Sequence, residues 1–244
     1  MPRLRILAAA ALGVLAVCTP SPGLAQVDMS KMRTYYVVLM MRGEPAPPGT
    51  DGAAVMKAHL ASMTELASRR QLVGAGPIAD RESPLRGVFI LDVATRAEAE
   101  RIANDDPAVK AGRLKPVVLA WFAEKGVGDG YFERTAGKPD VEVPMADYQF
   151  GLLMRGPQAD AIPADQLAEI QKGHMAHIGR MAEQGTLVAA GPFQDGGDYR
   201  GIFVLRAASL DAARALAGQD PAVQAGRMRL DLFPWKVAEG VFRK

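Results

Sequence analysis

The chain carries a tandem duplication, and this feature constrains its fold more than any other. Residues 106–113 (DPAVKAGR) and 220–227 (DPAVQAGR) differ at one position and begin 114 residues apart. Shorter matches recur at nearly the same spacing: LMMRG with LLMRG, VGAGP with VAAGP, RGVFIL with RGIFVL, and Trp121 with Trp235. Such a period suits one small domain rather than a solenoid repeat of about 20–50 residues. We therefore expect two copies of one domain, residues 32–126 and 145–244.

Each copy shows the element order β-α-β-β-α-β, the ferredoxin-like plan. Thr95 with Glu98 three residues later predicts a capped helix start, and Pro116 predicts an edge strand or a bulge. The apolar patterns place the elements of the first copy at residues 35–41, 53–70, 71–75, 87–93, 95–104 and 113–122, with a turn at 107–111. Those of the second copy fall at residues 148–154, 163–184, 187–190, 201–205, 209–218 and 228–235.

A sheet with helices on one face needs cover for its other face. Two copies in one chain can cover each other, so the sequence predicts an α+β fold. In it, two ferredoxin-like βαββαβ repeats pack sheet to sheet as an intramolecular pseudo-dimeric α/β barrel. Residues 127–144 join them and, being rich in glycine, proline and charge, are predicted to be a linker. The assembly is expected to be a monomeric pseudo-dimer or a homodimer.

Residues 1–25 are typical of a secretory signal peptide. Arg3 and Arg5 precede an apolar run at residues 6–17, and small residues precede a cleavage site after Ala25. The run is shorter than the ~20 residues that a spanning helix needs, so a retained anchor is disfavoured and no membrane span is expected in the mature form. Lipid attachment at Cys18 is the other alternative. In each case we expect the domains outside the cytoplasm, in a bacterial periplasm.

The charge balance argues against a nucleic-acid partner. The full sequence has 29 basic and 27 acidic residues, and loss of Arg3 and Arg5 leaves equal numbers of each. A mature chain without net charge or a basic run lacks the electrostatic footprint of nucleic-acid binding. Cys18 is the one cysteine, so the mature domains rely on core packing, for which 49% hydrophobic residues suffice.

The histidines and two repeated aspartates are the candidate catalytic residues. His59 and His174 occupy matched positions on the first helix of each copy, on its apolar stripe. A histidine facing the sheet needs a hydrogen-bond partner, and Asp106 and Asp220 are the candidates. Such a carboxylate fixes the ring tautomer and leaves the other nitrogen as a base near neutral pH. The alternatives are a satisfied core histidine and an aspartate that only caps the helix beginning at the following proline.

The third histidine, His177, has no counterpart, because Ser62 stands at its place in the first copy. It is predicted to lie on the helix surface or at a groove edge. Three histidines spread over two copies make a poor metal site, and the sequence has no phosphate loop, zinc-type spacing or Gly-x-Ser-x-Gly elbow. We therefore expect neither a metal nor a cofactor.

Three arginines also recur, since Arg42 matches Arg155, Arg86 matches Arg200 and Arg113 matches Arg227. Arginine binds planar anions such as carboxylates well. Substrate binding is predicted for Arg42, Arg155, Arg86 and Arg200. The alternative is a solvated charge at a strand end or a structural ion pair.

Each copy resembles the YCII-related domains. The resemblance rests on Ala58-His59-Leu60, Gly76-Pro77 and the Asp106-Pro107 block, and on their counterparts around His174, Gly191-Pro192 and Asp220. It implies a dimeric α/β barrel, usually built by two chains, with a His–Asp pair in a cleft, here His59 with Asp106 and His174 with Asp220. It also implies a relationship to muconolactone isomerase-like proteins and to a branch that removes chloride from a chlorinated hydroxyhydroquinone.

Three functions follow from these expectations. The first is a cofactor-free acid–base enzyme of the isomerase, lyase or dehalogenase type, acting on a small polar or aromatic compound. The second is a periplasmic small-molecule binding module without turnover. The third, a purely structural domain, is disfavoured because both copies keep the histidine and the aspartate.

Overall fold

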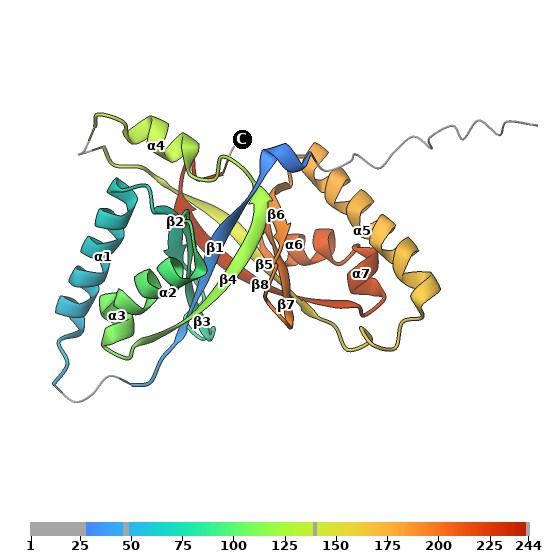
Figure 1. Cartoon of the computed structure of the whole chain (residues 1–244), viewed down its shortest axis with the longest axis horizontal. Helices are drawn as coiled ribbons and strands as arrows, with labels where there is room; N and C mark the ends of the chain where they lie inside the picture. Colours follow the sequence, from blue (N-terminus) through green and yellow to red (C-terminus); the bar gives the residue numbers. More distant parts are fainter. Residues whose placement is uncertain (1–27, 46–48, 139–140, 243–244) are drawn as a thin grey trace, which may run out of the picture.

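The structure, a computed structural model, describes residues 28–45, 49–138 and 141–242 (Figure 1). Within them, each copy has the predicted β-α-β-β-α-β order, with one short extra helix before its last strand. The first half comprises β1 (Met32–Arg42), α1 (Gly52–Ser68), β2 (Leu72–Pro77), β3 (Leu85–Leu91), α2 (Arg96–Asp105), α3 (Pro107–Lys110) and β4 (Leu114–Glu124). The second comprises β5 (Met145–Arg155), α5 (Ala164–Glu183), β6 (Leu187–Pro192), β7 (Tyr199–Leu205), α6 (Leu210–Ala217), α7 (Pro221–Gln224) and β8 (Met228–Ala238).

Each half forms a four-stranded antiparallel sheet, in the order β2-β3-β1-β4 and β6-β7-β5-β8. β1 is buried on both faces because residues 35–40 are apolar without a break. β4 is an edge strand, as Pro116 predicted, and Pro116 pairs with Met40 without a register shift. Thr95 caps α2 by accepting a hydrogen bond from the Glu98 N–H, also as predicted.

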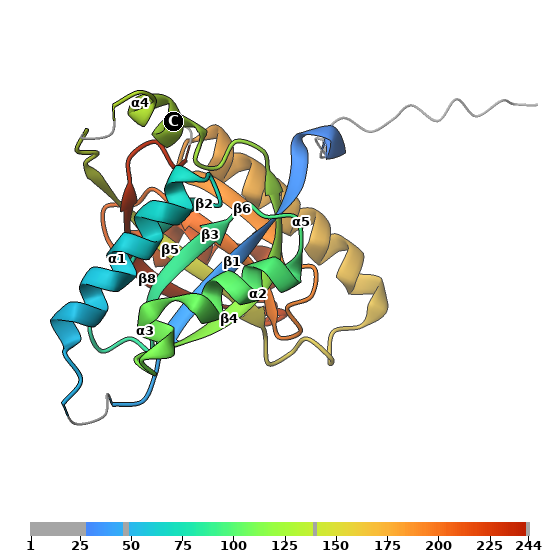
Figure 2. The ribbon, with the colours of Figure 1, turned by 60° about the vertical axis from the view of Figure 1, so that its left-hand side comes forward.

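The two sheets pack face to face and close into one barrel (Figure 2). The end of β2 meets β8, where the Ala79 N–H donates to the Pro234 carbonyl at 2.8 Å. The end of β6 meets β4, where the Gln194 N–H donates to the Ala120 carbonyl at 2.9 Å. One apolar cluster, which includes Trp121 and Trp235, runs between the sheets and draws on both halves. The predicted pseudo-dimeric barrel is confirmed.

The repeated Gly-Pro motif is a consequence of this closure. A Cβ atom at Gly76 would lie 1.7 Å from the carbonyl oxygen of Lys236, and one at Gly191 would lie 2.1 Å from that of Phe122. No side chain fits where the backbones of the two halves approach so closely. The motif therefore marks the two seams of the barrel.

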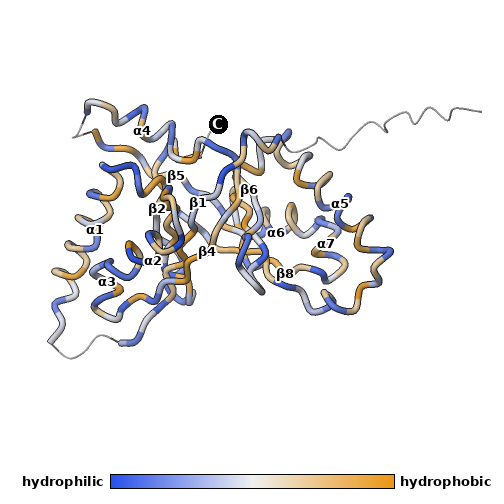
Figure 3. Tube along the Cα trace, viewed as in Figure 1, coloured by the Kyte–Doolittle hydropathy of each residue, from blue (hydrophilic) through white to orange (hydrophobic). Residues whose placement is uncertain are grey.

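The helices cover the outer faces of the sheets. Separate apolar clusters lie between each sheet and its own helices. α5 buries His174, His177 and Met181, whereas α1 buries no residue completely and leaves Met56 and Leu60 exposed. Figure 3 marks the apolar positions along α1 in orange. The histidine-bearing helix is thus set deeper in the second half than in the first.

The segment predicted as a linker holds a helix, α4 (Asp129–Thr135). Phe132 is buried, and the Gly128 and Tyr131 N–H groups donate to Val241 and Gly240 at 2.7 and 3.0 Å. These contacts with the C-terminal end, which composition could not reveal, order this part of the segment.

A 3-10 turn at Met29–Lys31 leads into β1. The signal-peptide prediction for residues 1–25, with Cys18, lies outside the described residues, and no helix within them is long and apolar enough to cross a membrane.

Candidate functional site

The structure brings both predicted His–Asp pairs together. His59 Nδ1 lies 2.7 and 2.9 Å from the two carboxylate oxygens of Asp106. His174 Nδ1 lies 2.6 Å from Oδ2 of Asp220. Both aspartates are buried, and both histidine rings lie largely inside the protein. The duplication has thus produced the same arrangement twice, between the first helix and the Asp-Pro block of each half.

Each aspartate also caps the short helix that follows it. Oδ1 of Asp106 accepts the Ala108 N–H at 2.8 Å, and Oδ1 of Asp220 accepts the Ala222 N–H at 2.8 Å. The capping alternative and the histidine-binding alternative are therefore both true of the same carboxylate. The cap fixes the carboxylate, and the carboxylate in turn fixes the imidazole.

A carboxylate can only accept hydrogen bonds, so the proton of the neutral imidazole lies on Nδ1. Nε2 is then the basic nitrogen. His174 Nε2 has no hydrogen-bond partner in the described part of the chain. This arrangement is the one that a histidine general base requires.

A phenylalanine packs against each ring, a feature that sequence reasoning missed. Phe89 lies with its ring centroid 5.8 Å from that of His59, at an interplanar angle of 23°. Phe203 lies 6.2 Å from His174, at 21°. The signal was available, because both residues sit at the same place in the repeated RGVFIL and RGIFVL stretches. They hold each imidazole over the sheet.

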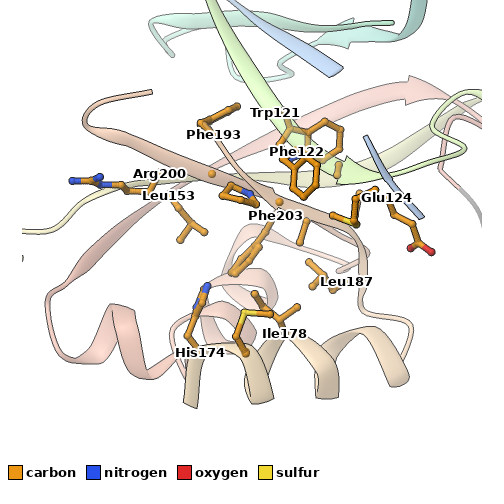
Figure 4. Close-up of a pocket in the computed structure, with 18 of the residues that line it drawn as sticks. Trp121, Phe122, Glu124, Leu153, His174, Ile178, Leu187, Phe193, Arg200 and Phe203 are labelled. Atoms are coloured by element: carbon orange, nitrogen blue, oxygen red, sulfur yellow. The ribbon is translucent and has the colours of Figure 1, made fainter. Parts of the chain in front are cut away.

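A cavity of about 950 Å³ lies beside the second pair. It is bounded by α5, β6 and β7, and also by β4 of the first half. Figure 4 shows His174 reaching up from α5 toward Phe203, with Trp121 and Phe122 of β4 on the opposite wall. The walls are mainly apolar. The charged side chains among them are Glu124, Lys125, Arg155, Arg200 and Arg227.

The predicted substrate-binding arginines behave differently in the two halves. In the first half, Arg42 donates to the carbonyl of Ser83 at 3.3 Å and also to that of Arg81, and Arg86 donates to the carbonyl of Arg81 at 2.6 Å. These two hold the loop between β2 and β3. Their counterparts Arg155 and Arg200 line the cavity of the second half.

The comparisons with known proteins match the tandem duplication of the chain. The model of the YCII-related domain matches residues 34–121 and 150–236, more than half of the chain. The chain belongs to the YCII-related family. A search of curated proteins found no match. The predicted family is thus confirmed for both halves.

Solved structures show the fold of this YCII-related chain at low sequence identity. An arginine variant of chlorite dismutase from Candidatus Nitrospira defluvii is 10% identical, with a TM-score of 0.55, over 85% of this chain and 92% of that one. The same enzyme in complex with imidazole is 9% identical, with a TM-score of 0.53 and the same coverage. These similarities support the duplicated barrel fold and extend across both halves.

The prediction for His177 was wrong. It is 4% exposed and points into the protein, and its Nε2 is buried with no hydrogen-bond partner among the described residues. Arg180 approaches Nδ1 at 3.5 Å. Burial lowers the pKa of His177, an effect that the Asp220 carboxylate partly opposes. The periodicity misplaced it because α5 is buried on a wider face than α1, where Ser62 stands at this position.

Among the residues that the structure describes, no group of three or more His, Cys, Asp or Glu side chains could hold a metal ion. No such group forms around His174 and His177 within these residues. The groups present at the described site include the His174 imidazole, which pairs with the Asp220 carboxylate, and the guanidinium groups that line the cavity.

Proposed function

We propose that this protein is an exported, cofactor-free acid–base enzyme that acts on a small molecule. The observation that carries the proposal is His174, held by Asp220 through Nδ1 and lining a largely apolar cavity. Export rests on the signal-peptide pattern of residues 1–25.

The geometry supports proton transfer. Nε2 of His174 would take a proton from a carbon acid or hydroxyl of the substrate, and the Asp220 carboxylate would stabilise the imidazolium that forms. The apolar walls would exclude water and strengthen the attraction between the developing anion and the cavity arginines.

Two outcomes are open to the proton on His174. Its return to another atom of the substrate gives an isomerisation. Alternatively, the electron pair left behind forms a new double bond while a leaving group such as chloride departs as an anion, which gives an elimination. Neither course requires an electron acceptor or a bound metal.

Hydrogen exchange at carbon acids tests this proposal across a panel of candidate substrates. Aromatic keto acids and unsaturated lactone acids would be incubated with the protein in D₂O and followed by proton NMR. A general base accelerates proton transfer by about 10²- to 10⁴-fold, so accelerated exchange is expected for a suitable compound. It should fall to background in the double variant His59→Ala with His174→Ala.

His177→Gln is the matched control, because His177 is buried on the same helix but bonds to neither aspartate. It should retain the exchange. Melting temperatures of all variants would show whether each is folded. If compounds bind but none shows accelerated exchange, the proposed enzyme activity is refuted. That result would favour the alternative, a periplasmic binding module that uses the same cavity.

A further inference from the structure

The recurrent arginines differ between the halves in the kind of group that holds them. In the first half all three are held by backbone: Arg42 and Arg86 by carbonyls of residues 80–83, and Arg113 by the carbonyl of Gly52 at 3.2 Å. A backbone carbonyl cannot leave its place without refolding its segment. These arginines are therefore committed to structure.

In the second half, the guanidinium groups of the matching arginines either pair with other side chains or have no hydrogen-bonding partner among the described residues. Arg155 pairs with the carboxylate of Asp160, and Arg227 donates to Gln171 Oε1 at 3.0 Å. The Arg200 carbonyl accepts the Phe193 N–H at 2.9 Å, but the Arg200 guanidinium group makes no hydrogen bond or ion pair in the described part of the chain. Exposed side chains can swing away at little cost, so these guanidinium groups are available to a ligand.

The position of Asp160 indicates what that ligand carries. Its side chain is 86% exposed and pairs with Arg155. The hydrogen bond from Arg155 lowers the pKa of Asp160, and the charge of Arg200 acts in the same direction. Thus two cavity arginines already act on one exposed carboxylate. An exposed ion pair of this kind contributes little stability, so a ligand carboxylate can replace it.

We infer that the second half alone binds ligand and that the ligand is one small aromatic or alicyclic carboxylate, whose charge replaces Asp160 at Arg155 and Arg200. The inference deepens the proposed function and rests on it for the role of His174. The apolar body of the ligand lies against Phe203 and the β4 wall, and about 950 Å³ is room for a fused two-ring system. The first pair, His59 with Asp106, is then structural.

Calorimetry with 2-naphthoate tests the inference, with 2-naphthamide as the uncharged compound of the same shape. The wild-type protein should bind one naphthoate per chain and bind the amide at least about tenfold more weakly, because the charge-assisted hydrogen bonds are lost. Arg155→Gln and Arg200→Gln should each weaken naphthoate binding about tenfold or more.

The duplication supplies the matched controls. Arg42→Gln and Arg86→Gln occupy the equivalent positions and should change naphthoate binding by no more than about twofold, although they lower the melting temperature. The inference would be overturned if two naphthoates bind per chain or if naphthoate does not bind. It would also be overturned if both sets of arginine variants lose the same naphthoate affinity, or if the amide binds as tightly as naphthoate.

The single histidine variants separate this inference from the proposed function. If one naphthoate binds per chain but no compound shows hydrogen exchange, the inference of a single ligand site holds and the proposed enzyme activity is refuted. If His59→Ala and His174→Ala each reduce the exchange rate by half, the enzyme activity holds and the inference of a single site is refuted.

Discussion

Asp220 illustrates how one residue links local structure to chemistry. One carboxylate oxygen accepts the Ala222 N–H at the start of α7, and the other holds His174. Asparagine caps a helix about as well as aspartate, so Asp220→Asn should keep the cap while losing the charge that stabilises an imidazolium. The functional contribution of this residue can therefore be separated from its structural one.

His177 should make the folded protein sensitive to acid. Burial lowers its pKa below 6.5, with Arg180 reinforcing and Asp220 opposing the shift. The unfolded chain therefore binds this proton at a higher pH than the folded chain, and stability falls as the pH drops below about 6.5. Melting curves at pH 7.5 and 5.5 should show a smaller loss for His177→Gln than for the wild type. An equal loss would contradict this assignment.

The pairing of His59 with Asp106 and of His174 with Asp220 could be predicted because both residues recur at matched positions. The partners of the arginines could not, since Arg42 and Arg155 look identical in their repeated motifs. What separates them is a backbone carbonyl in one half and an exposed carboxylate in the other. Such differences arise from loop conformation, which short motifs do not encode.

At the scale of secondary structure, the seams of the barrel depend on glycine. Gly76→Ala or Gly191→Ala would place a methyl group about 2 Å from a backbone carbonyl of the other half. The loss of stability should reach about 3 kcal/mol or more, because neither backbone can yield without opening a seam. Chemical denaturation measures it.

Gly179 provides the control for these substitutions. It lies within α5, and a Cβ there would meet nothing within 4 Å. Gly179→Ala should therefore stabilise the protein by about 0.5–1 kcal/mol. Seam variants as stable as Gly179→Ala would show that the two halves do not meet as described.

Most elements could be predicted from periodicity to within a few residues, because a half-buried strand and an amphipathic helix leave different patterns. α4 was missed. Its residues are rich in glycine and charge, and its order comes from contacts of Phe132, Gly128 and Tyr131 with the body of the protein. Local composition cannot report contacts with residues a hundred positions away.

At the scale of the whole molecule, the two halves share one central core. Trp121 belongs to the first half and Trp235 to the second, and the chain has no other tryptophan. Trp235→Phe therefore leaves a reporter in the first half, and Trp121→Phe leaves one in the second. In each single-tryptophan variant the fluorescence and far-UV circular dichroism midpoints in urea should coincide, because the halves unfold together. Separate midpoints would mean that each half is stable alone.

The central claim is that Asp220 holds His174 as a base in a ligand cavity. Nitrogen-15 NMR of the imidazole side chains tests it most directly, since the chain has three histidines to assign. His174 should show the tautomer with its proton on Nδ1, lose that preference in Asp220→Asn, and shift on addition of 2-naphthoate while His59 does not. If the nitrogen-15 chemical shifts of His174 change neither in Asp220→Asn nor on addition of naphthoate, the account is contradicted.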